Sequence, residues 1–297
     1  MKTNEKTGRE KLASSRMKYV FPNLVTATNL SLGAVSTFLS FSGNLYWAGW
    51  IILLSVLLDK LDGTTARLLG ASSRFGVEFD SLADLIAFGL APAVFAFSAL
   101  TRSSIIETTT ATTVLSGACC CIYVLCSAIR LARFNVEDTL GGSDVYFGLA
   151  MPMAGGLTSS ALLFMMKYAP HNSVYQSWAL DYRLLGNFST PDEMFHYFWI
   201  YILFLSFLMV SGVKVPKLKR TGKTGMDIYL VSNIVLTYLV VPFRVFPGYL
   251  WLVAFQYLAI SVFYTLFIKD SKKHKKRDFL DVLSVQPYKE KPVKTED

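Results

Sequence analysis

The sequence predicts an all-α fold, a polytopic membrane bundle of about eight transmembrane helices. Of its 297 residues, 53% are hydrophobic and only 17% are charged, with a mean hydropathy of +0.40. Apolar runs near the roughly 20 residues that a spanning helix needs recur along the whole chain. The number and length of these runs exclude a soluble α-helical protein. The predicted helices are Pro22–Phe41, Leu45–Leu69, Gly76–Leu100, Ile105–Leu131, Tyr146–Tyr168, Met194–Val213, Met226–Val241 and Tyr249–Lys269.

Basic residues are distributed unevenly between the two sides of this bundle. If the N-terminus is cytoplasmic, 25 of the 29 Lys and Arg residues lie before the first helix, in the inner connections or in the tail. The positive-inside rule predicts this asymmetry, so the net charge of +8 is a topology signal and gives no reason to expect a nucleic-acid partner. We expect cytoplasmic termini, with an N-terminal tail over residues 1–16, a transmembrane domain over 17–269 and a charged tail over 270–297.

The first predicted helix is polar in its first half, where Asn23, Thr26 and Asn29 lie. Pro22 suits the first turn of such a helix. A helix that faced only lipid would not carry these side chains, so the polar half is expected to face a wet cavity near the cytoplasmic surface. Packing of helices through small hydroxyl groups is the alternative, and it has nearly equal weight for Thr28 and Ser31 in the same half of the helix.

The inner end of the second predicted helix carries a polar motif. Asp59 and Asp62 are three residues apart, and Gly63 and Ala66 fall on the same side of the helix, with Arg67 at its edge. The two small residues would let a ligand approach the backbone.

The third predicted helix carries two more carboxylates on one face, Asp80 and Asp84. In a helical hairpin Asp80 and Asp84 would face the first pair, so the four carboxylates are expected to converge. Such a group of oxygen ligands suits hard divalent cations such as Mg²⁺ or Mn²⁺. The alternative is two solvated acidic helix ends beside Lys60, Arg67 and Arg74. It is weakened because Asp80 and Asp84 lie inside an apolar run with few cations nearby.

All four cysteines lie in the fourth predicted helix. Their spacing within an apolar run indicates packing and argues against zinc binding or disulfides. Arg130 and Arg133 are three residues apart at the inner end of this helix. Such a pair suits a carboxylate or a phosphate, and snorkelling topology anchors are the equal alternative.

Eight positions at fixed spacing match a family signature, D-x2-D-G-x2-A-R-x8-G-x3-D-x3-D, and they are Asp59, Asp62, Gly63, Ala66, Arg67, Gly76, Asp80 and Asp84. The chain therefore resembles the CDP-alcohol phosphatidyltransferases, whose fold is implied for the helix bundle. The stretches Phe88–Ala93, Arg130–Asn135 and Leu208–Ser211 are similar to the membrane-integral CDP-diacylglycerol–serine O-phosphatidyltransferases of bacteria and archaea.

The resemblance implies roles for individual residues. Two divalent cations would be held by the four aspartates, and Asp84 would also be the general base. The CDP part of the lipid donor would lie along the remaining motif and first-helix residues, which are Asn23, Thr26, Asp62, Gly63, Ala66, Arg67 and Ser73. Arg130 and Arg133 are the candidate readers of the carboxylate of serine. A homodimer in a prokaryotic cytoplasmic membrane is implied by the family alone.

The implied reaction is attack of the serine hydroxyl on CDP-diacylglycerol, with release of CMP and formation of phosphatidylserine. A metal pair can stabilise both the attacking and the leaving oxygen at phosphorus. Glycerol phosphate, inositol phosphate, choline or ethanolamine are alternative acceptors. A divalent-cation transporter is a more distant alternative, disfavoured because Leu85–Phe97 beyond the aspartates is apolar.

Overall fold

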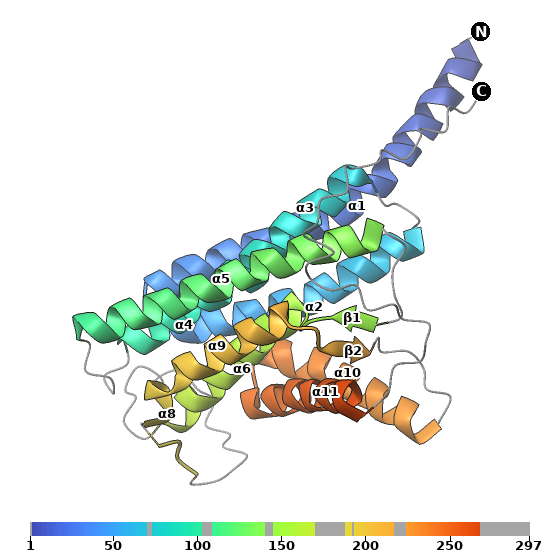
Figure 1. Cartoon of the computed structure of the whole chain (residues 1–297). Coiled ribbons are helices and arrows are strands. Elements are labelled where there is room, and N and C mark those ends of the chain that lie inside the picture. The colour runs from blue at the N-terminus through green and yellow to red at the C-terminus, as the bar shows by residue number, and fades with distance from the viewer. Residues whose placement is uncertain are drawn as a thin grey trace.

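A computed structural model describes residues 2–69, 73–102, 109–139, 145–169, 188–191, 193–216 and 224–267. The described chain is a bundle of helices with one small two-stranded sheet (Figure 1). In chain order its elements are α1 (Lys2–Phe41), α2 (Leu45–Leu69), α3 (Arg74–Asp84), the π-helix η1 (Leu85–Leu90), α4 (Ala91–Arg102), α5 (Thr110–Thr139), β1 (Val145–Phe147), α6 (Met151–Tyr168), α8 (Glu193–His196), α9 (Phe198–Val210), β2 (Lys214–Pro216), α10 (Thr224–Phe243) and α11 (Pro247–Phe267).

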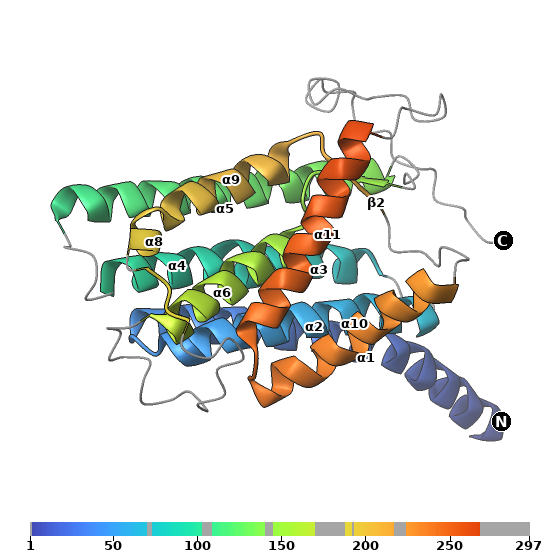
Figure 2. The ribbon, with the colours of Figure 1, turned by 90° about the horizontal axis from the view of Figure 1, so that it is seen from below.

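Helix α2 lies near the centre of the bundle and contacts α1, α4, α6 and α10. On one side, α1 packs along α3, η1 and α4, and α5 packs between α4 and α9. On the other side, α11 packs against α6, and Figure 2 shows it crossing that helix obliquely. The N-terminal part of α1 projects away from the bundle in both views.

Helices occupy each of the eight ranges predicted from the sequence. Three segments in the described part of the chain are long and apolar enough to cross a membrane: Pro22–Phe41, Phe75–Arg102 and Thr110–Val136. Shorter apolar helices include Phe198–Val210 and Pro247–Phe263. The length and composition of these helices indicate an integral membrane protein. The number of eight crossings stays a prediction.

Two helix starts differ from the expectation. Helix α1 begins at Lys2, so Pro22 lies inside it and not in its first turn, and the helix crosses the expected boundary between residues 16 and 17. The fourth predicted helix begins at Thr110 and continues to Thr139, beyond the expected end at Leu131.

The fifth predicted helix, expected from Tyr146, begins only at Met151. Residues Val145–Phe147 instead pair as an antiparallel strand with Lys214–Pro216, which shortens the sixth predicted helix as well. The reason is Gly148, whose φ of +78° interrupts helical geometry and where a Cβ would lie 2.3 Å from the Met209 carbonyl oxygen.

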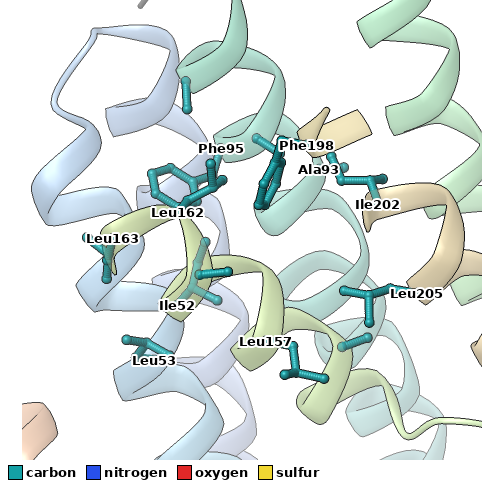
Figure 3. Close-up of a cluster of buried hydrophobic side chains, with 14 of the residues drawn as sticks. Ile52, Leu53, Ala93, Phe95, Leu157, Leu162, Leu163, Phe198, Ile202 and Leu205 are labelled. Carbon is teal, nitrogen blue, oxygen red and sulfur yellow. The ribbon is translucent and has the colours of Figure 1, made fainter. Parts of the chain in front are cut away.

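The apolar core lies where α2, α4, α6 and α9 meet. Figure 3 shows side chains from these helices interdigitating, and their removal from water and close packing hold the four helices together. Among the buried members are Ile52, Leu53, Phe95, Leu157, Leu162, Leu163, Phe198, Ile202 and Leu205. All four cysteines are free, as the sequence predicts, and Cys119 and Cys120 are buried.

Helix α1 approaches η1 closely at Gly33. A Cβ at this position would lie 2.7 Å from the Cα of Ala87 in η1, nearer than real atoms approach. Small residues at such crossings let membrane helices pack backbone to backbone. The absence of a side chain at Gly33 therefore lets α1 come close to η1, the π-helix that directly follows α3.

Replacing Gly33 with valine is expected to destabilise the protein by about 1–3 kcal/mol, because the added atoms must push backbone away from backbone. Thermal unfolding of the detergent-solubilised protein measures the loss. Ala34→Val is the matched control, since Ala34 is exposed on the same helix. Equal unfolding temperatures for the two variants would contradict the importance of this contact.

Candidate active site

Three carboxylates from two helices converge at one end of the bundle. Asp59 comes from α2, and Asp80 and Asp84 come from α3. One carboxylate oxygen of each lies within 4.8 Å of those of the other two, and all three side chains are half-buried. Asp59 of the first predicted pair therefore faces Asp80 and Asp84 of the second pair.

Asp84 lies at the C-terminal end of α3, directly before η1. Its Oδ1 atom is buried and has no hydrogen-bond partner among the described residues, and its carboxyl group is close enough to that of Asp59 to hydrogen-bond. The guanidinium group of Arg130 on α5 interacts with it electrostatically and opposes the repulsion from the other aspartates. A bare buried carboxylate oxygen beside two further carboxylates is an arrangement that needs a cation or a proton.

A π-helix begins immediately after Asp84. In η1 the Ala91 N–H donates to the Ile86 carbonyl, five residues back. Pro92 then has no N–H to offer to the carbonyl of Phe88, and the Tyr123 hydroxyl of α5 donates to that oxygen at 3.2 Å. Local π geometry is frequent at functional sites, and here it sets the direction in which the helix leaves the acidic cluster.

The first helix contacts the start of α3 through Asn23. A Cβ on Gly76 would lie 3.1 Å from the Asn23 Oδ1 atom, so the signature glycine leaves room for this side chain. Ser73 is the N-cap of α3, where its Oγ accepts a hydrogen bond from the Gly76 N–H at 3.0 Å. Two of the predicted donor-binding residues, Asn23 and Ser73, thus lie beside the first turn of α3.

Two polar residues farther along α1 are buried and already hydrogen-bonded. The Thr26 hydroxyl donates to the Pro22 carbonyl at 3.2 Å. Asn29 bonds Ser55 of α2, and both side chains are almost fully buried. For Asn29 the helix-packing alternative is therefore the better reading.

The remaining predicted donor-binding residues are Asp62, Gly63, Ala66 and Arg67. They belong to the last turns of α2, but their side chains lie outside the part of the chain that the structure describes. The membership of Asp62 in the acidic cluster therefore stays a prediction.

The two predicted acceptor residues are buried on α5, Arg130 with 8% and Arg133 with 7% of its surface exposed. Arg130 lies over the Phe134 ring at 5.0 Å and interacts with Asp84. An Arg133 Nη1 donates to the Val210 carbonyl at 3.5 Å, at the end of α9. Burial of both guanidinium groups argues against snorkelling anchors, which would keep their charges in water.

Two contacts near the cluster were not predicted from the sequence. The Tyr238 hydroxyl of α10 donates to the Leu57 carbonyl at 3.3 Å, and it also interacts electrostatically with Asp59. On the other side the Asn135 Nδ2 donates to the Ser81 Oγ at 3.0 Å, which fixes α5 against α3 beside Asp80. Tyr238 is a single tyrosine in an apolar run, and nothing in the sequence indicates its partner. Asn135 could have been singled out, because it ends the stretch Arg130–Asn135 that carries the family resemblance.

Comparison with known proteins decides the family. A sequence model described as CDP-alcohol phosphatidyltransferase matches residues 19–186, which is more than half of the chain. The chain belongs to the CDP-alcohol phosphatidyltransferase family. The match runs from within α1 to beyond the end of α6 and therefore contains Asp59, Asp80 and Asp84, whereas α9, α10 and α11 lie beyond it.

Several curated relatives of this CDP-alcohol phosphatidyltransferase carry names of serine-using enzymes. A Helicobacter pylori protein named CDP-diacylglycerol–serine O-phosphatidyltransferase is 33% identical over 219 residues, 74% of this chain and 81% of that protein. An archaetidylserine synthase of Methanothermobacter thermautotrophicus is 32% identical over 203 residues, 68% and 71% of the two chains. The Saccharomyces cerevisiae CDP-diacylglycerol–serine O-phosphatidyltransferase is 36% identical over 180 residues, 57% and 58%.

The acidic cluster of this CDP-alcohol phosphatidyltransferase fits the divalent cations that the family uses. The three carboxylates offer only oxygen ligands, which Mg²⁺ and Mn²⁺ prefer, and the Asp84 Oδ1 has no hydrogen-bond partner in the described part of the chain that would occupy it. The structure does not distinguish the two metals.

Manganese is expected to raise the unfolding temperature of the wild-type protein, because a ligand that binds only the folded state at 100 times its Kd stabilises it by about 2.7 kcal/mol. Asp80→Asn should abolish this rise. Glu78→Gln, which removes an exposed charge from the same helix, should keep it. The measurement is differential scanning fluorimetry with increasing Mn²⁺, and an undiminished rise in Asp80→Asn would contradict cation binding at the cluster.

Proposed function

We propose that this protein is a phosphatidylserine synthase, which transfers the phosphatidyl group of CDP-diacylglycerol to the hydroxyl group of L-serine and releases CMP. The observation that carries the proposal is the convergence of Asp59, Asp80 and Asp84 within 4.8 Å in a chain of this family. The serine acceptor is supported by the names of its relatives, which cover most of the chain.

In this proposal Asp84 accepts the proton of the serine hydroxyl. A hydroxyl group is a poor nucleophile until a base takes its proton, and Asp84 has a buried oxygen atom with no partner among the described residues to compete for that proton. When bound, two divalent cations would neutralise the donor pyrophosphate and stabilise the attacking and leaving oxygens. Asp59, Asp62, Asp80 and Asp84 are the proposed ligands.

The donor nucleotide is proposed to lie along the α2–α3 turn. Asn23 and Ser73 are polar groups at that turn, and the predicted contacts of Asp62, Gly63, Ala66 and Arg67 would continue the same surface along α2. The Thr26 hydroxyl already donates to the Pro22 carbonyl of its own helix, so this residue would contribute to the shape of the nucleotide site and not to its hydrogen bonds.

Arg130 and Arg133 are the proposed readers of the serine carboxylate. They are buried cations on one face of α5, and Arg130 reaches Asp84, the proposed base. An acceptor whose hydroxyl group is at Asp84 would therefore have its carboxylate within reach of the same helix face. Charge-assisted bidentate contacts of this kind give arginine its preference for carboxylates.

The arrangement in the membrane is also proposed. With eight crossings and the positive-inside rule, both termini and the acidic cluster would face the cytoplasm of a prokaryotic cell. The predicted tail over residues 270–297 and most of the predicted outer loop over 169–193 lie outside the described residues. A homodimer is proposed from the family alone.

The deciding experiment measures CMP release from CDP-diacylglycerol by the purified protein, with serine, glycerol phosphate, inositol phosphate, choline and ethanolamine offered in turn. Each acceptor is tested with Mg²⁺, with Mn²⁺ and with chelator. We expect release with serine and a divalent cation only. Faster release with another acceptor would overturn the serine assignment and leave the transferase assignment intact.

Asp84→Asn is expected to lower kcat by at least about 100-fold, because the amide keeps the shape of the side chain and cannot accept the proton. Glu78→Gln is the charge-matched control on the same helix. Serine-dependent CMP release is the assay, and retention of the α-helical circular dichroism spectrum shows that the fold is intact. A variant with near wild-type kcat would remove the proposed base.

Arg130→Ala and Arg133→Ala are expected to raise the KM for serine by roughly 10-fold or more, the effect of losing a hydrogen bond to a charged group. The KM for CDP-diacylglycerol should change much less. The control is Arg102→Gln, which changes a cation at the far end of α4 from the acidic cluster. An unchanged serine KM in both alanine variants would rule out their role as carboxylate readers.

A further inference from the structure

The π-helix η1 is contacted closely by three neighbouring helices. Gly33 of α1 approaches it as described above, and a Cβ on Gly155 of α6 would lie 3.4 Å from the Phe88 Cα. On a third side α5 packs so closely that a Cβ on Gly89 would lie 3.2 Å from the Ser127 Cβ. Small residues at such crossings let membrane helices pack backbone to backbone. The six residues that directly follow the acidic cluster are therefore held by close packing.

We propose that Tyr123 of α5 is a positioning residue for the acidic cluster. Its hydrogen bond to the Phe88 carbonyl keeps η1 in the π conformation, and this conformation keeps Asp80 and Asp84 turned toward Asp59. The inference rests on the proposed function, because it takes the cluster to be the cation site of the transferase. A side chain on α5 thus acts on the cluster through the backbone of η1.

The first step of the argument concerns helical register. Helices α3 and α4 are joined through η1 in one apolar span, Phe75–Arg102. Successive residues of an α-helix are separated by roughly 100° around its axis. The bond from the Ala91 N–H to the Ile86 carbonyl spans five residues, one more than an α-helical bond. The π segment therefore offsets the faces of α3 and α4 by about one residue relative to an uninterrupted α-helix.

The second step is that this offset determines where the aspartates point. Eight of the 12 residues of α4 are buried, so packing fixes the rotation of this helix. In α3, Ala83 is the only buried residue among those whose side chains the structure describes. If η1 became α-helical, α3 would therefore rotate and α4 would not. A rotation of roughly 100° would turn the Asp80 and Asp84 side chains away from Asp59.

The third step is the effect of the phenol. Tyr123 has 1% of its surface exposed, and its hydroxyl donates to the Phe88 carbonyl at 3.2 Å. Pro92 offers this carbonyl no N–H, and a buried carbonyl without a partner costs free energy in an apolar interior. The phenol therefore stabilises η1 in the conformation in which the Phe88 carbonyl points toward α5.

The test measures Mn²⁺ binding in the absence of donor and acceptor. Purified protein in detergent is titrated with Mn²⁺, and the electron paramagnetic resonance signal of free Mn²⁺ gives the Kd. Tyr123→Phe removes the hydroxyl and keeps the ring. Tyr201→Phe is the matched control, since the Tyr201 hydroxyl of α9 donates to the Leu157 carbonyl of α6 at 3.5 Å, outside η1.

Tyr123→Phe is expected to raise the Kd for Mn²⁺ by about fivefold, the factor that corresponds to the loss of one hydrogen bond. The control is expected to keep the wild-type Kd. A purely structural role would lower the unfolding temperature of both variants and leave both Kd values unchanged. An unchanged Kd in Tyr123→Phe would therefore overturn the inference, and so would an equal rise in Tyr201→Phe.

A pair of glycine variants tests the same claim if the tyrosine variant does not fold. Gly155→Ala places a methyl group 3.4 Å from the Phe88 Cα, so it presses on η1. Gly156→Ala is the neighbouring control, since a Cβ there would meet the Val56 Cγ2 at 3.9 Å, an ordinary contact. Displacement of η1 is expected to raise the Kd at least about twofold in Gly155→Ala and not in Gly156→Ala. Equal Kd values in the two variants would overturn the inference.

The two proposals fail in different ways. If Tyr123→Phe weakens Mn²⁺ binding but serine releases no CMP from the wild-type protein, the positioning role stands and the acceptor assignment fails. If serine releases CMP and the Kd does not change, the reverse holds. A wild-type protein that binds no Mn²⁺ overturns both the positioning role and the proposed cation site.

Discussion

Mutual repulsion among three carboxylates is the constraint on which the rest of this structure depends. Asp59, Asp80 and Asp84 bring their oxygen atoms within 4.8 Å of one another in a bundle that is otherwise apolar. Carboxylates within a membrane helix cost free energy, and they occur mainly at functional sites. A buried arginine, Arg130, offsets part of the repulsion, and the remaining positive charge is expected from bound cations. The site is therefore complete only with its ligands.

Holding the carboxylates together requires helices that approach closely and do not slide. Gly33 lets α1 touch η1, and Gly76 leaves room for Asn23 at the start of α3. The hydrogen bonds from Asn135 to Ser81 and from Tyr238 to the backbone of α2 then attach the neighbouring helices beside the cluster. Close packing and hydrogen bonds thus supply the rigidity that opposes the repulsion.

Much of this could be predicted from the sequence, because the main signals are local. Hydrophobic runs located the helices, and the spacing of Asp80 and Asp84 placed them on one face. What could not be predicted depends on contacts between distant segments. Nothing near Tyr238 indicates that it bonds α2, and the strand Val145–Phe147 forms only with its distant partner Lys214–Pro216. Pro92 shows in the sequence that the Phe88 carbonyl lacks its usual helical partner, but it does not show that a π-helix precedes it or that Tyr123 is the donor.

The Phe88 carbonyl links Pro92 in the helix after η1 to Tyr123 on α5. The Phe88 oxygen bonds the Tyr123 hydroxyl because proline cannot satisfy it. Losing the phenol would take a donor away from this buried oxygen at a position where the proline offers none. The bond from Tyr123 therefore takes the place of a backbone hydrogen bond, and it joins α5 to the segment that begins directly after Asp84.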